Sequence, residues 1–284
     1  MNAKLTDPAA RKRAHTRATR IADETAWFVH TEAAVEIKER LAEVNRSFTN
    51  PLIIGGQSRF LDAALPNATR HPEADRLTSN AAPHDLVVHF MNLHWADDPV
   101  GQLVQSRLCL DPDGLFLAIS PGGETLSELR SVLAQAETEI TGGLSPRVLP
   151  MGELRDLGAL LMRAGFALPV ADSVTLDLRY SSFRSLTRDL RAIGETNALA
   201  ARLRHPSRRA IFERAEALYR EHFADKDGHL KVSVELIVLT GWAPADTQPQ
   251  PLRPGSAKNR LADALGTQEA PLNDPARPKF NAPD

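Results

Sequence analysis

The chain has 284 residues, 42% of them hydrophobic and 25% charged, a globular balance that excludes a fully disordered or fibrous protein. Its 34 Lys and Arg residues against 36 Asp and Glu residues leave a net charge of −2, so bulk charge indicates neither nucleic acid nor an anionic membrane as a partner. Cys109 is the only cysteine, which excludes an internal disulfide and a thiolate zinc cluster and favours a reducing, cytoplasmic location.

The N-terminal segment is basic. Its first twenty residues hold one acid, Asp7, against Lys4, Arg11, Lys12, Arg13, Arg17 and Arg20. No apolar stretch follows, so a secretory signal is not expected; a solvated helix start is favoured over a partner-binding arm or a targeting segment. From Ile21 to Val44 apolar side chains recur at spacings of three and four, so residues 1–45 are predicted to form a basic, helical arm.

The C-terminal segment is rich in proline. Residues 244–284 hold eight of the twenty prolines, and such a segment buries too little apolar surface to offset its chain entropy. It is predicted to be mostly disordered and dispensable for folding, apart from one short helix over 256–265.

Strands and helices alternate through residues 46–243, the predicted compact domain. Strands are predicted at 52–54, 86–88, 115–120, 168–179 and 231–240. Helices are predicted at 99–108, from a capping box at Thr125 and Glu128 to 140, at 152–164, from Ser181 or Ser182 to near Gly194, and from Pro206 to Tyr219, with a turn at 111–114. This order predicts an α/β layer fold with a mostly parallel sheet, in which the late strand pair fits an antiparallel edge.

Several long strings resemble a known family. NLHWADDP at 92–99 and LDPDGLFLAISPGGETLSELR at 110–130 resemble class I S-adenosylmethionine-dependent methyltransferases. Within that superfamily the likeness is to an assembly factor of respiratory complex I, and it continues through 136–150, 156–166, 189–197 and 239–244. A malonyl carrier protein methyltransferase of biotin synthesis shares the LHW and LxPDG strings. The resemblance implies a Rossmann-like sheet of seven strands with helices on both faces.

The cofactor turn of that family is degenerate here. Active members end the first strand in an acid followed by G-x-G-x-G; this chain reads IIGGQSR, in which Gly55 matches the first glycine. Ile53, Gln57 and Arg59 replace the acid and the later glycines. The gap 57–84 has room for at most one short strand and one short helix, so the second and third βα units are expected to be shortened. The acid that would hold the cofactor ribose has no clear position, Glu73 and Asp75 being weak candidates.

The resemblance nevertheless assigns candidate site residues. Those aligned with S-adenosylmethionine contacts are Gly55, Gly56, Asn92, Leu93, His94 and Trp95. Candidate catalytic residues are Asn92, which could bond a substrate, His94, which could move a proton, and Glu195, in the loop after Gly194. The alternative for the central pair is that Trp95 packs over the next helix and His94 is a satisfied polar residue.

The remaining polar residues carry weaker signals. Gly122, Gly123 and Glu124 lie at a helix start, where ligand contact is less favoured than a partnership of the glutamate with the helix dipole. Glu137 and Glu139 with Arg147 could form a polar cluster, but exposed helix charge is the favoured interpretation. His89 and Cys109 are expected to be structural. No His or Cys spacing indicates a metal site.

Two functions follow from the resemblance. The first is a methyltransferase-superfamily protein that holds or modifies a complex I subunit, with a degenerate S-adenosylmethionine site. The second is active methyl transfer, for example to malonyl carrier protein. Whether the chain is an enzyme stays open; eukaryotic relatives are described as protein arginine hydroxylases. A complex I subunit is the expected partner, with membrane association through that partner only.

Overall fold

The computed structural model describes residues 4–77, 83–249 and 265–267. The chain divides into two compact units, Met1–Asp246 and Thr247–Asp284, of which the first holds the sheet. Apart from 244–249 and 265–267, the proline-rich tail and its expected helix lie outside the described residues, so their properties stay predictions. The separation of an arm at residue 45 also stays a prediction.

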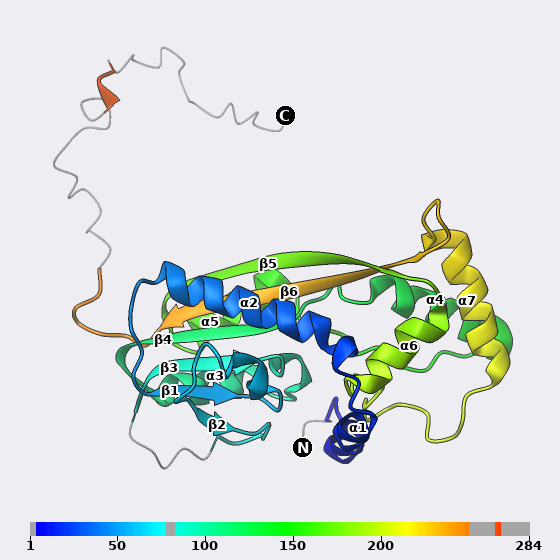
Figure 1. Cartoon of the computed structure of the whole chain (residues 1–284), viewed down its shortest axis with the longest axis horizontal. Helices are drawn as coiled ribbons and strands as arrows, with labels where there is room; N and C mark the ends of the chain where they lie inside the picture. The colour runs from blue at the N-terminus through cyan, green and yellow to red at the C-terminus, as the bar shows by residue number, and fades with distance from the viewer. Residues whose placement is uncertain (1–3, 78–82, 250–264, 268–284) are drawn as a thin grey trace, which may run out of the picture. The chain divides into compact units, whose positions relative to one another are not determined.

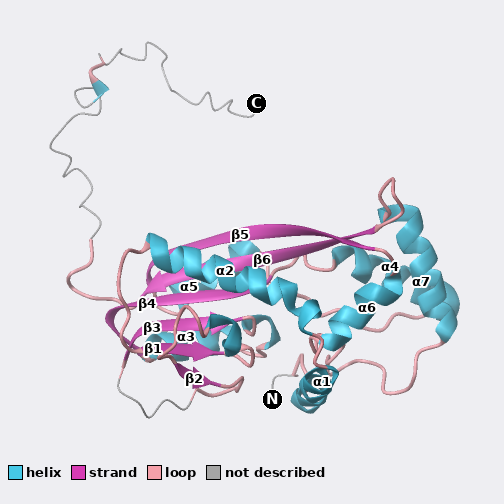
Figure 2. Ribbon diagram, in the orientation of Figure 1, coloured by secondary structure: helices cyan, strands magenta, loops and turns pink. Residues whose placement is uncertain are grey.

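A six-stranded sheet forms the centre of the first unit, in the order β2-β1-β3-β4-β6-β5. The first four strands in this order are parallel: β2 (Thr69–His71), β1 (Pro51–Ile54), β3 (His84–Phe90) and β4 (Leu110–Pro121). The last two, β6 (Leu230–Trp242) and β5 (Ala167–Tyr180), are long, and β6 runs antiparallel to both of its neighbours, β4 and β5 (Figures 1 and 2). The expected α/β sheet with an antiparallel last strand is confirmed.

Helices cover both faces of this sheet. On one face α2 (Phe28–Glu43), α4 (Ser127–Thr141), α6 (Phe183–Ala192) and α7 (Arg209–Phe223) share a core with β3 and β4. On the other, α3 (Pro99–Leu108) and α5 (Leu154–Arg163) pack on the opposite side chains of the same strands. Strand β3 is therefore apolar at consecutive positions, since a strand covered on both faces has no solvent-facing side.

The shortened βα units are also confirmed. Between Gly56 and the start of β3 at His84, the described residues contain only a 3₁₀ turn, Ser58–Leu61, and the three-residue β2. The sheet thus has one strand fewer than the seven that the resemblance implies.

Two local patterns were overridden by tertiary contacts. The expected turn at 111–114 lies inside β4, because Asp113 and Gly114 exchange backbone hydrogen bonds with Ala243. The expected capping box is wrong: α4 begins at Ser127, Thr125 donates its hydroxyl to the Glu235 carbonyl, and Glu128 accepts from Ser233. Both side chains of the expected capping box therefore form hydrogen bonds with β6 instead of with the helix terminus.

The N-terminal region forms two helices rather than one. Helix α1 (Pro8–Ile21) ends where Ala22 adopts a left-handed conformation, with φ 51°, and a 3₁₀ turn, Glu24–Trp27, leads into α2. Helix α1 contacts α6, and its Arg11 is only 5% exposed, so a fully solvated helix start is excluded. No helix within the described residues is both long and apolar enough to cross a membrane.

Candidate functional site

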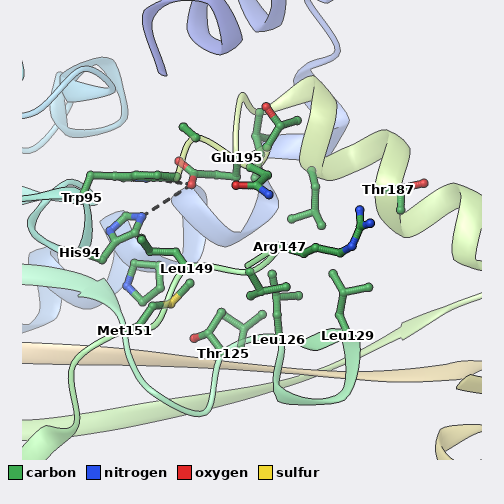
Figure 3. A pocket seen from close by; sticks show the side chains of 18 of the residues that line it. His94, Trp95, Thr125, Leu126, Leu129, Arg147, Leu149, Met151, Thr187 and Glu195 are labelled. Carbon is green, nitrogen blue, oxygen red and sulfur yellow. Dashed lines mark hydrogen bonds and ion pairs between the residues drawn. The ribbon is translucent and has the colours of Figure 1, made fainter. Parts of the chain in front are cut away.

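A pocket of about 390 Å³ opens at the carboxyl ends of β3 and β4, where open α/β sheets bind ligands. Its walls come from α2, α4, α6, the loop 147–151 and the loop 195–199 (Figure 3). Most of the lining is apolar and includes Val29, Leu126, Leu129, Leu149, Met151 and Ile193. The pocket is therefore suited to a largely apolar group.

One end of the pocket is polar, formed by His94, Trp95 and Glu195. Trp95 donates its indole N–H to Glu195 Oε2 at 2.9 Å, and His94 Nε2 lies 3.6 Å from the same oxygen (Figure 3). The first two residues follow β3 in a 3₁₀ turn, Leu93–Trp95, and the third comes from the loop after α6. Burial raises the pKa of Glu195, but the Arg11 guanidinium together with His94 and His30 outweighs burial and holds that pKa below the usual glutamate range. Glu195 is therefore a partly buried carboxylate anion, with its side chain 22% exposed.

Buried histidine nitrogens at this end of the pocket make no hydrogen bonds with other described residues, although His94 Nε2 keeps its ion-pair contact with Glu195. In the described part of the chain, His94 has no hydrogen bond on either ring nitrogen and His30 has none on Nδ1. Both residues line the pocket, and His30 is only 3% exposed. Burial lowers the pKa of His30 to about 4, so its imidazole is neutral at pH 7. Buried polar atoms are normally paired, which marks these nitrogens as contacts for a bound group.

Helix α1 contacts Trp95 and Glu195 through Arg11. Arg11 donates its Nε–H to both oxygens of Glu73, at 2.7 and 2.8 Å, and Nη1 lies 3.4 Å from Glu195 Oε1. Four residues further along α1, His15 reaches to 3.9 Å from the position that a Cβ on Gly56 would take. The N-terminal helix thus fills the space beside the degenerate glycine turn.

The residues at this turn do not fit S-adenosylmethionine held in the methyltransferase manner. Ile53, which stands for the usual acid, is fully buried. Arg59 forms an ion pair with Glu24. Of the two weak candidates for the ribose acid, Glu73 is bonded to Arg11 and Asp75 forms an exposed ion pair with Lys4. The carboxylates that a cofactor would require are therefore missing or taken.

Gly55 is needed by the fold itself. Its φ is +137°, and a Cβ there would overlap the carbonyl oxygen of Phe90. We expect Gly55→Ala to destabilise the protein by about 2 kcal/mol or more, through backbone strain and overpacking. Gly56→Ala is the matched control, because its Cβ would meet only His15 at 3.9 Å. Thermal melts of both variants test this; equal melting temperatures would contradict a structural role of Gly55.

The six residues aligned with cofactor contacts separate into two groups. His94 and Trp95 line the pocket, whereas Gly55, Gly56, Asn92 and Leu93 lie outside its lining. Asn92 is 6% exposed, and its side-chain oxygen has no partner among the described residues. Of the three candidate catalytic residues, His94 and Glu195 are brought together and Asn92 is not part of their network.

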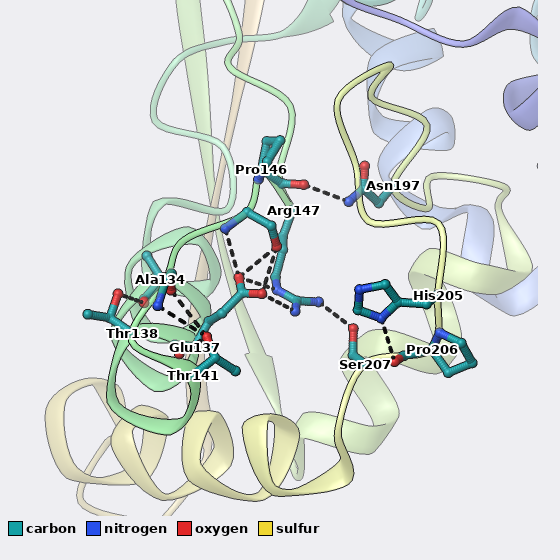
Figure 4. Close-up of polar contacts among 12 residues, drawn as sticks. Ala134, Glu137, Thr138, Thr141, Pro146, Arg147, Asn197, His205, Pro206 and Ser207 are labelled. Atoms are coloured by element: carbon teal, nitrogen blue, oxygen red, sulfur yellow. Dashed lines mark hydrogen bonds and ion pairs between the residues drawn. The ribbon is translucent and has the colours of Figure 1, made fainter.

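A second polar cluster lies at the far end of the pocket, where the favoured interpretation of exposed helix charge is wrong for Glu137. That residue is 3% exposed and accepts from Arg147 Nε at 2.9 Å and Nη2 at 2.7 Å (Figure 4). Arg147 also donates to the Ser207 hydroxyl. Glu139 is exposed and pairs with Arg214 instead.

The glycine pair before α4 is closed by the protein's own acids. A Cβ on Gly122 would meet the Glu235 side chain, and one on Gly123 would meet Glu153. The amide of Glu124 donates to Glu235 Oε2 at 3.1 Å.

His89 is fully buried in β3, and burial raises the pKa of Cys109. Over the described ranges, no group of three or more His, Cys, Asp or Glu side chains has metal-binding geometry.

Sequence patterns missed Arg11 and His30. Arg11 lies in a uniformly basic segment, and its partners are 62 and 184 positions away, so no local spacing marks it. His30 lies in a regular helical pattern, and only the structure shows that it is buried beside the pocket.

Comparison with known proteins gives relatives of two kinds. Arginine-hydroxylase NDUFAF5, mitochondrial, of Homo sapiens is 37% identical over 201 residues, which are 69% of this chain and 56% of that protein. Its Dictyostelium discoideum counterpart is 35% identical over 184 residues, 64% of this chain and 42% of that protein. Malonyl-[acyl-carrier protein] O-methyltransferase of Laribacter hongkongensis is 32% identical over 216 residues, 76% of this chain and 70% of that protein.

The comparisons with solved structures and with family models are less informative than the comparison with curated relatives. Among solved structures, the YcgJ protein of Bacillus subtilis is 12% identical with a TM-score of 0.45, over 74% of this chain and 99% of that one. No family model matches the chain. This chain spans about half the length of its NDUFAF5 relatives. The expected cytoplasmic location is wrong, because these relatives are mitochondrial by name. The sheet and the relative of which this chain covers 70% show that the chain belongs to the class I methyltransferase superfamily, within which it is similar both to the NDUFAF5 arginine hydroxylases and to the malonyl-[acyl-carrier protein] O-methyltransferases.

Proposed function

We propose that this chain is an assembly factor of the complex I type, which binds an arginine-bearing segment of a complex I subunit at the pocket and does so without S-adenosylmethionine. The observation that carries the proposal is the partly buried Glu195 carboxylate, hydrogen-bonded by Trp95, at one end of an apolar pocket. An apolar wall with one carboxylate at its end suits a cationic side chain on an otherwise apolar segment.

The charges around the pocket support the same class of ligand. Among the described residues that line it, Arg147 is the only Lys or Arg, and its guanidinium is engaged by Glu137 and Ser207. A bound anion would therefore find no free cation. A guanidinium can donate to Glu195, and the Nδ1 atoms of His30 and His94 can each accept a further N–H group when Nε2 carries the proton.

The roles of this chain's residues in that complex are binding and orientation. Glu195 and Trp95 would fix the plane of the guanidinium, since a carboxylate and an aromatic face are the groups that guanidinium prefers. The leucines of α4 would cover the neighbouring apolar part of the segment. The relatives named arginine hydroxylases support arginine as the recognised residue.

A second candidate is methyl transfer to malonyl carrier protein. It is favoured by the Laribacter hongkongensis relative, 70% of which is covered by this chain. A malonyl group carries a carboxylate, however, and would need the cation that Glu137 already holds. The pocket therefore favours the first candidate.

Complementation distinguishes the two candidates. In cells that lack the related assembly factor, we expect the wild-type chain to restore assembled complex I on native gels. Glu195→Gln should reduce that amount severalfold, because it removes the carboxylate charge at the end of the pocket, whereas the exposed Glu139→Gln should not. The second arm deletes this chain from its own cells. Normal complex I in those cells, together with a requirement for biotin, would overturn the proposal in favour of the second candidate.

A further inference from the structure

The surroundings of Arg11 have the composition of a guanidinium site. Its side chain is 7% exposed, and its Nε–H donates to both oxygens of Glu73. Its Nη1 lies 3.4 Å from Glu195, and its guanidinium carbon lies 4.2 Å from the Trp95 ring centroid. Two carboxylates and an aromatic face thus enclose one planar cation. We call Glu73, Trp95 and Glu195 the guanidinium box.

The guanidinium box adjoins the pocket. Trp95 and Glu195 line the pocket on one side and contact Arg11 on the other. Glu195 therefore offers one oxygen to the indole N–H and the other to Arg11. A guanidinium entering from a bound segment would compete with Arg11 for these two residues.

Helix α1 is held to the body mainly by polar contacts. Apart from Arg11, its buried residues are Ala14 and Ala18, which contribute little apolar area. Asp7 accepts from Arg202 and Arg204, each at 2.9 Å, and Thr6 donates to Asp97. Arg17 donates to Thr196 at 2.9 Å, beside Glu195. Ala18 and Ala10 do join small apolar clusters, with Trp27 and with Trp95 respectively. Neither of the two larger clusters on the faces of the sheet contains a residue of α1, so the helix can be displaced without opening them.

We propose that Arg11 is an internal ligand, which occupies in cis the guanidinium box that a partner's arginine enters when α1 is released. This inference deepens the proposed function and rests on it. Arg11 keeps Glu73 and Glu195 neutralised while the chain is free. A partner that supplies its own arginine replaces the same charge-assisted hydrogen bonds, so the exchange leaves neither of these partly buried carboxylates unpaired.

The test uses the full chain with Arg11→Ala and N-acetyl-arginine amide as the probe. We expect the probe to bind this variant about tenfold or more tightly than the wild type, since the variant leaves the box empty. Arg13→Ala, an exposed arginine on the same helix, is the matched control and should behave like the wild type. The citrulline analogue, which lacks the charge, should not bind. Equal affinity of the probe for Arg11→Ala and the wild type would overturn the proposal.

Two further variants keep the test decisive. In Arg11→Ala combined with Glu73→Gln, the gained binding should be lost, because one wall of the box has no charge; retained binding would contradict the assignment. If Arg11→Ala alone does not fold, refolding with the arginine probe should recover more soluble protein than refolding with the citrulline analogue. Equal recovery would count against the box. Both readouts are independent of complex I, so the proposed function can fail in cells while the box is still confirmed, and the reverse.

Discussion

S-adenosylmethionine is expected to bind this protein about two to four orders of magnitude more weakly than it binds a family member with an intact glycine turn. Ile53 replaces the acid at the end of β1, and Arg11 engages Glu73, one of the two weak candidates for the ribose acid. Charged hydrogen bonds contribute about 1.5–3 kcal/mol each, so two missing ones amount to about 3–6 kcal/mol. Each ~1.4 kcal/mol is a factor of ten in affinity.

Isothermal calorimetry on the full chain measures this directly. A malonyl-[acyl-carrier protein] O-methyltransferase such as the Laribacter hongkongensis relative, titrated under the same conditions, shows that the cofactor sample is competent. A low-micromolar dissociation constant for this chain would contradict the expectation. Methyl transfer would then become the leading function, with Asn92, His94 and Trp95 as the first residues to substitute.

Glu137→Ala is expected to destabilise the protein by about 3–5 kcal/mol, because removing one partner of a buried ion pair leaves the other unpaired. Glu137 is 3% exposed, and its partner Arg147 keeps only the Ser207 hydroxyl (Figure 4). For a domain of this size the melting temperature should fall by roughly 6–20 °C. Glu139→Ala, two residues along α4, is the matched control. Its exposed pair with Arg214 should contribute less than about 1 kcal/mol.

The effect of Glu137 should also depend on pH. The hydrogen bonds from Arg147 lower the pKa of Glu137 from 4.5 to about 2. A lowered pKa in the folded state stabilises the protein above the unfolded pKa, and that contribution is lost as the carboxylate takes up a proton. The difference in melting temperature between the wild type and Glu137→Ala should therefore be full above about pH 4.5 and should shrink towards pH 2. A constant difference over this range would show that Glu137 acts through packing alone.

Most of the fold could be predicted from the sequence, because its signals are local. The Ser182 cap of α6 and the alternation of β5 depend on neighbours within a few positions, and both are observed. The capping box at Thr125 and Glu128 is equally local, yet it failed because β6 offers both side chains other partners. A local rule holds only where no distant strand competes for the same polar atoms.

The candidate site was predictable only in part. His94 and Trp95 could be found, because they follow a buried strand at the edge of the sheet where ligands bind. Glu137 and Arg147 are ten positions apart, a spacing that no helical pairing rule covers, and the loop between them creates the contact. Arg11 and its carboxylates come from three separate parts of the chain, so only the folded structure reveals them.

The distance along the chain between Arg11 and Glu195 also sets an order of events during protein synthesis. The two residues are 184 positions apart, and at ~5–20 residues per second the ribosome completes the second roughly 9–37 s after the first. Glu73 emerges first, only 62 positions behind Arg11. The N-terminal helix of a nascent chain is therefore available to other proteins in the cell for many seconds before its last carboxylate partner exists.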